Sequence, residues 1–91
     1  MSETILLVED NELNRDMLSR RLTRRGYTVV VAEDGERGLD LVRSERPDLV
    51  LMDVNLPGIS GVDATRVISA LESGPVVVLL ATYDEDEFDQ A

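Results

Sequence analysis

The sequence predicts an α/β protein in which a doubly wound parallel sheet is covered by helices on both faces. Four short apolar runs alternate with three stretches in which apolar residues recur at helical spacing. The runs do not alternate between polar and apolar residues, which is typical of parallel strands buried on both faces. Right-handed crossovers between such strands produce a layered α/β architecture.

Length and composition predict a single domain over residues 1–91. The chain is 43% hydrophobic and 31% charged, values typical of a globular domain. A chain this short buries a modest core, so we expect a thin margin of stability. The sequence has no stretch near the ~20 apolar residues that span a bilayer and no signal-peptide pattern, so we expect a cytoplasmic protein without membrane contact.

Charge and residue usage exclude several classes of function. The formal net charge of −10 disfavours direct binding to nucleic acids or anionic membranes, and favours divalent cations or basic partner surfaces. Cysteine, histidine and lysine are absent, and all nine basic residues are arginine. Disulfides, thiolate or imidazole metal ligands and a phosphohistidine are therefore excluded within this chain.

The first strand is predicted over Ile5–Val8, and a helix follows from residue 12 to residue 25. Asn11 can cap this helix, and Gly26 suits the left-handed residue that ends it. The apolar residues at helical spacing within it are Leu13, Met17, Leu18 and Leu22. The pattern therefore predicts one strand followed by one amphipathic helix.

A second strand and helix follow in the same order. The strand is predicted over Thr28–Ala32, and Asp34 can cap a helix that ends before Pro47. Leu39 and Val42 are expected on the inward face of that helix. The third strand, Leu49–Met52, then places Asp53 at its carboxyl end.

The last predicted elements begin after a turn. Ser60 and Asp63 match a capping box for a third helix, which Gly74 and Pro75 end. The expected apolar face of that helix consists of Ala64, Val67, Ile68 and Leu71. Residues 76–80 form the fourth strand, and the acidic stretch 84–88 suits the opening turn of a fourth helix.

Three carboxylates follow the carboxyl ends of two strands. Glu9 and Asp10 leave the first strand, and Asp53 leaves the third. If these strands are neighbours, the three acids share one small volume, where ligands bind in open parallel sheets. Their mutual repulsion calls for a cation, and oxygen ligands without histidine or cysteine indicate Mg²⁺ or a similar ion. On position alone, three solvated loop carboxylates are an equal alternative.

A carboxylate beside Mg²⁺ can act as a nucleophile toward phosphorus. Asp53 is the natural nucleophile, because it stands alone at its strand end while Glu9 and Asp10 reach the metal from the other side.

Two segments give these acids a specific context. Residues 5–11 and 49–61 resemble the two signature segments of bacterial two-component response-regulator receiver domains. The acidic pair, the aspartate ending the third strand, Pro57 four residues later and Gly61 four residues further on all match the pattern. The resemblance extends from Thr4 to about Phe88 and implies a flavodoxin-like receiver fold.

The resemblance also implies roles for individual residues. Asp53 would accept a phosphoryl group from a histidine kinase or a histidine phosphotransfer protein. Glu9, Asp10 and Asp53 would hold Mg²⁺ together with the backbone carbonyl of Asn55. Apart from its own aspartyl phosphorylation and dephosphorylation, such a domain is not an enzyme. The hydroxyl residue that senses the phosphoryl group at the end of strand four would be Thr82, which we favour over Ala81.

The chain departs from the family pattern at its C-terminal end. It ends within the predicted fourth helix, so the fifth strand, the fifth helix and the lysine that ends strand five are missing. The fourth strand would then be an edge strand without a protecting charge or proline. Three interpretations follow: a fragment, part of a chimera, or pairing of strand four with another copy or a partner.

Two rival functions remain open on the sequence. The first is a receiver-like interaction module whose site does not switch, since the family's lysine is missing. The second is a metal-dependent phosphatase with an aspartyl nucleophile. Such enzymes usually carry a second aspartate two residues on, where this chain has Asn55.

Overall fold

The computed structural model describes residues 3–71 and 74–80. Within them the order of elements is the predicted β-α-β-α-β-α-β. The elements are β1 (Thr4–Val8), α1 (Glu12–Arg24), β2 (Thr28–Ala32), α2 (Gly35–Glu45), β3 (Leu49–Asp53), α3 (Gly61–Ser69) and β4 (Val76–Leu80). Most of the bounds agree with the predicted ones. β1 begins one residue earlier, α1 ends one residue earlier, β3 ends one residue later, and α3 ends at Ser69, a few residues before the predicted stop at Gly74. The predicted opening of a fourth helix at 84–88 lies outside the described residues.

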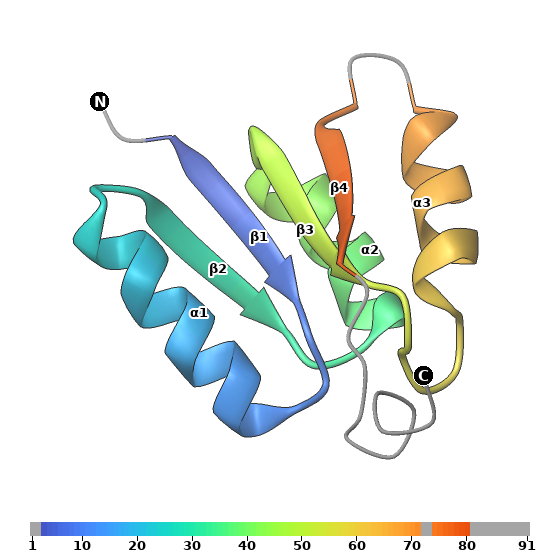
Figure 1. The fold of residues 1–91 in the computed structure, drawn as a ribbon. Coiled ribbons are helices and arrows are strands. Elements are labelled where there is room, and N and C mark those ends of the chain that lie inside the picture. Colours follow the sequence, from blue (N-terminus) through green and yellow to red (C-terminus); the bar gives the residue numbers. More distant parts are fainter. Residues whose placement is uncertain (1–2, 72–73, 81–91) are drawn as a thin grey trace.

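The four strands form one parallel sheet in the order β2-β1-β3-β4. The central pair, β1 and β3, is in register so that Val8 lies opposite Met52. Figure 1 shows α1 on one face of this sheet and α2 and α3 on the other. The doubly wound α/β fold is therefore confirmed, and so is the adjacency of β1 and β3 on which the predicted site depends.

The main core lies between the sheet and the pair α2 and α3. It consists of Leu6, Val8, Ala32, Leu41, Val42, Val50, Met52, Ala64 and Ile68. Leu6, Val8, Val50 and Met52 point to this face because side chains alternate along a strand. The predicted inward position of Val42 is confirmed, and Leu39 packs against the cluster.

The opposite face of the sheet is covered less completely. Ile5 and Leu7 are buried there, yet α1 itself contributes no buried residue. Leu13 is 80% exposed and Met17 is also exposed, while Leu18 and Leu22 are half-buried. Among the described elements, α1 alone lies on this face of the sheet. Its apolar residues at the outer side of the helix therefore have no neighbouring helix to pack against and stay exposed.

Helix caps follow the sequence signals with one exception. The side chains of Asn11, Asp34 and Ser60 each accept a hydrogen bond from the backbone N–H three residues later. The return bond of the predicted capping box is not formed within the described residues. The Asp63 carboxylate lies 3.9 Å from Arg66 Nη1 instead, which satisfies its charge on the surface. Gly26 has the predicted left-handed conformation, with φ 95°.

Strand β4 is at the edge of the described sheet, the position that was predicted for it. Val76 is 66% exposed, and Val78 and Leu79 are also exposed. Nowhere in residues 3–71 and 74–80 is there a helix of the length and hydropathy needed to cross a bilayer.

Candidate functional site

The tips of β1 and β3 bring the three predicted acids together. Glu9 follows the last residue of β1, Asp10 comes next, and Asp53 ends β3. Each of the three offers a carboxylate oxygen, and these oxygens all lie within 4.8 Å of one another. The sheet register causes this convergence, because Val8 and Met52 are paired and the residues after them are therefore adjacent.

Two of these acids are buried, which is unusual for carboxylates. Glu9 and Asp53 are each only 1% exposed, whereas Asp10 is exposed. Glu9 Oε1 accepts the backbone N–H of Asn11 at 3.1 Å, and Asp53 Oδ1 accepts that of Asn55 at 3.0 Å. Glu9 Oε2 is buried and has no hydrogen-bond partner among residues 3–71 and 74–80. A buried carboxylate oxygen without a hydrogen-bond partner is energetically costly unless a positive charge lies beside it or the group is protonated.

The pKa of Glu9 is raised above its usual range, chiefly because burial penalises the charged carboxylate. The neighbouring charges of Asp53 and Asp10 raise it further, and the hydrogen bond from the Asn11 N–H opposes the shift in pKa. Without a cation, ionisation of Glu9 in the cluster is therefore less favourable than that of a solvated glutamate. A bound divalent cation would remove that penalty.

Replacing Glu9 by glutamine is expected to stabilise the cation-free domain by about 1–2 kcal/mol at pH 7. Because the pKa of Glu9 is raised in the folded state, the neutral side chain contributes stability at pH values below the usual pKa of glutamate. This contribution is lost as the pH rises through the pKa of the folded state. The gain over wild type should therefore shrink as pH falls toward 4.5. Urea unfolding in chelator at both pH values measures it.

The control for this experiment is Glu33→Gln, which changes the same functional group at an exposed position. Its unfolding free energy should stay within about 0.5 kcal/mol of wild type at both pH values. A gain for Glu9→Gln that is the same at pH 7 and pH 4.5 would contradict the assigned titration.

The site fits a hard divalent cation. It provides three convergent carboxylate groups, one with a buried unpaired oxygen, and no nitrogen or sulfur ligand. Asn55 lies in the bend after β3, two residues past Asp53, and donates its N–H to Asp53. The backbone carbonyl of Asn55 stays a predicted fourth ligand of the cation.

Thr82 and the alternative Ala81 lie outside the described residues, so the hydroxyl that would sense the phosphoryl group also stays a prediction.

Two further residues hold the acids in place, and the sequence did not identify these roles. Arg15 Nη1 donates to the backbone carbonyl of Glu9 at 3.0 Å and to that of Asp10 at 3.4 Å. Gly61 opens α3 directly against β3, where a Cβ would overlap the backbone carbonyl oxygen of Asp53. Gly61 was part of the family pattern in the sequence, but only the packing reveals why a side chain is excluded there.

Comparison with known proteins identifies the family. The family model for the response regulator receiver domain matches residues 5–91. The chain belongs to the response regulator receiver domain family. Such a domain is a phosphoacceptor of two-component signalling, and the alternative of a non-switching interaction module is not favoured.

The curated relatives of this receiver domain are longer proteins. The chain is 43% identical over 82 residues to the transcriptional regulatory protein AfsQ1 of Streptomyces coelicolor, which covers 90% of this chain and 36% of that protein. It is 42% identical over 84 residues to the DNA-binding response regulator MtrA of Mycobacterium tuberculosis, covering 92% and 37% respectively. The chain thus spans about a third of the length of these relatives.

Solved receiver structures share the fold. The response regulator TrrA of Thermotoga maritima, solved in complex with Mg²⁺-BeF, is 33% identical with a TM-score of 0.84. That match covers 96% of this chain and 76% of TrrA. The BeF₃-activated receiver domain of Klebsiella pneumoniae RstA is 34% identical with a TM-score of 0.82, covering 93% and 72%. The flavodoxin-like receiver fold is therefore shown for this chain.

Proposed function

We propose that Asp53 accepts a phosphoryl group from a partner's phosphohistidine, with Mg²⁺ held by Glu9, Asp10, Asp53 and the backbone carbonyl of Asn55. The observation that carries this proposal is the convergence of three carboxylates, one of which, Glu9, has a buried oxygen without a hydrogen-bond partner in the described part of the chain. Family membership supports the same chemistry.

In the transfer, a carboxylate oxygen of Asp53 attacks phosphorus. An O–P bond forms, the N–P bond of the phosphohistidine breaks, and the departing imidazole takes up a proton. The N–H of Asn55 fixes Asp53 Oδ1 and so orients the nucleophile at the tip of β3. The contacts of Arg15 with the carbonyls of Glu9 and Asp10 keep the opposing loop in position.

Mg²⁺ would offset the negative charge that three acids and a phosphoryl group bring to one volume. TrrA was solved in complex with Mg²⁺-BeF, and its fold matches this chain with a TM-score of 0.84. This similarity supports Mg²⁺ as the cation.

The partner is a histidine kinase or a histidine phosphotransfer protein, located with this domain in the cytoplasm. The absence of histidine from the chain suits a recipient that takes its phosphoryl group from another protein. Apart from its own phosphorylation and dephosphorylation, the domain catalyses no turnover. Phosphorylation then adds charge beside the metal and biases a two-state equilibrium near Thr82.

The experiment that tests this function is incubation with acetyl phosphate and Mg²⁺, followed by intact mass measurement. The expected result is one phosphoryl adduct per chain that requires Mg²⁺ and decays with time. A chain that gains no adduct under these conditions would defeat the proposed function. Steady turnover of a generic phosphate ester would instead revive the phosphatase alternative.

Replacing Asp10 by asparagine is expected to weaken Mg²⁺ binding about tenfold or more, because a charged ligand is lost. Asp10 is exposed, so the fold should be retained. At Mg²⁺ tenfold above its dissociation constant, the wild-type domain should gain about 1.4 kcal/mol, or about 6–11 °C in Tm. Thermal unfolding across a Mg²⁺ titration measures both effects.

The matched control is Asp40→Asn, an exposed aspartate on α2. It makes the same change in net charge and should leave the Mg²⁺ response as in wild type. Equal Mg²⁺ midpoints for wild type and Asp10→Asn would remove Asp10 from the metal site.

Self-association through β4 is a separate prediction. The strand is at the edge of the described sheet, and Val76, Val78 and Leu79 on it are exposed. Sedimentation of the full chain should then depend on concentration, and Val78→Lys should abolish that dependence. A wild-type sedimentation coefficient that is constant across concentration would count against pairing of copies.

A further inference from the structure

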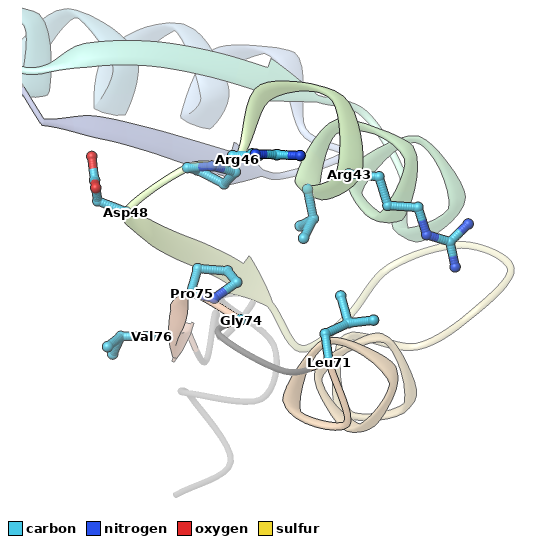
Figure 2. A pocket seen from close by; sticks show the side chains of 9 residues that line it. Arg43, Arg46, Asp48, Leu71, Gly74, Pro75 and Val76 are labelled. Atoms are coloured by element: carbon cyan, nitrogen blue, oxygen red, sulfur yellow. The ribbon is translucent and has the colours of Figure 1, made fainter.

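A groove of about 640 Å³ lies at the amino-terminal edge of the sheet, far from the acidic cluster. Its walls come from the end of α2, the residues that lead into β3, the residue Leu71 just after α3, and the start of β4. Figure 2 shows Leu71 pointing from the end of α3 toward α2, with Arg43 extending from α2 at the same end of the groove. This volume is in the range of protein sites that hold small ligands or side chains.

Two arginines give the groove a positive character in a chain of net charge −10. Arg43 and Arg46 are exposed, and neither takes part in an ion pair within the described residues. Arg46 follows α2 in the left-handed conformation, with φ 46°, which is uncommon for a residue with a side chain. The carboxylate of Asp48 also lines the groove, and its Oδ2 already accepts the backbone N–H of Thr4 at 2.8 Å.

The rest of the groove is largely apolar. Val42 and Pro47 line one side, and Pro75 and Leu71 line the other. Leu71 is 38% exposed, although it continues the apolar face of α3. A surface that combines unpaired guanidinium groups with partly exposed apolar side chains fits a ligand with carboxylates and an apolar group.

We propose that this groove binds an acidic peptide segment of a partner protein, with carboxylates on Arg43 and Arg46 and an apolar side chain against Leu71. Charge complementarity favours this occupant, because its carboxylates meet the two guanidinium groups that line the groove. Screening limits the reach of charges on the rest of the chain to about 8–10 Å. Among the residues that line the groove, the two arginines outnumber the single carboxylate, that of Asp48. The apolar walls favour a peptide over a free small anion, which has nothing to place against them.

The test is fluorescence anisotropy of the full chain with a labelled pentapeptide of two glutamates, a leucine and two glutamates. The wild-type chain should bind this probe, and a double variant with Arg43→Gln and Arg46→Gly should bind about tenfold more weakly. Glycine is chosen at position 46 because it adopts positive φ without strain. The control double variant, Arg21→Gln with Arg24→Gln, removes the same charge from exposed positions on α1 and should bind as wild type.

The apolar contact is tested separately. Leu71→Ala, or a probe with serine in place of leucine, should weaken binding about threefold or more. Circular dichroism melting of each variant verifies that it is folded.

Equal binding by the two double variants would overturn the site, as would failure of the wild type to bind the probe. Displacement of the probe by free glutamate at the same carboxylate concentration would overturn a peptide site in favour of a small anion. Concentration-dependent sedimentation that disappears only in the Arg43 and Arg46 double variant would make the occupant a second copy and overturn the partner.

Discussion

Replacing Asp53 by asparagine is expected to abolish phosphoryl uptake from acetyl phosphate, reducing the adduct below detection by intact mass. The amide oxygen that replaces the carboxylate is a far weaker nucleophile, and the site also loses a metal ligand. The fold should survive, because the variant removes one of two charges that are buried side by side. Cation-free unfolding should therefore show a domain at least as stable as wild type.

The control is Asp40→Asn on the surface of α2, which should be phosphorylated to the wild-type extent. An adduct that persists in Asp53→Asn would place the acceptor on another residue. Peptide mapping of the phosphorylated wild type, performed on the borohydride-reduced protein, would then locate that residue.

Replacing Gly61 by alanine is expected to cost about 3 kcal/mol of unfolding free energy, or roughly 12–24 °C in Tm. The added Cβ would meet the backbone carbonyl of Asp53 and the Cα of Val54, and backbone cannot move aside as the end of a flexible side chain can. Because the clash falls on the residue that carries the nucleophile, phosphorylation of the folded fraction should also slow. Thermal melting and the acetyl phosphate assay at low temperature measure the two effects.

Gly26→Ala is the informative comparison for this variant. Its Cβ would meet no atom within 4 Å, but the residue has φ 95°, so alanine is strained there without a clash. The expected cost is about 1–2 kcal/mol, with no effect on phosphorylation. Equal losses for the two variants would mean that close packing against β3 is not what requires Gly61.

The strands were predictable because they depend on short-range patterns, whereas the site also depends on which strands are neighbours. Runs without polar residues predicted buried parallel strands, and the acids that follow two of them predicted a cluster at one edge. The prediction required β1 and β3 to be neighbours, which the order of elements along the chain does not determine. The resemblance implied a flavodoxin-like receiver fold, and the observed sheet places β1 beside β3.

Other features depend on contacts that no local pattern encodes. The contact between Gly61 and the Asp53 carbonyl arises from the angle at which α3 leaves β3. The bonds from Arg15 to the loop carbonyls depend on where α1 begins relative to β1. The capping box at Ser60 was half wrong: within the described residues Asp63 forms no return bond, and its carboxylate lies near Arg66 on the surface of the helix.

The absence of buried side chains on α1 has an evolutionary consequence. Exchanges on an exposed helix face usually change stability by less than about 0.5 kcal/mol, whereas the strand tips tolerate few alternatives. Sequence drift can therefore remodel the outer surface of α1 while Glu9, Asp10 and Asp53 stay unchanged. Duplicated copies of such a domain could diverge in what they recognise before they diverge in their chemistry.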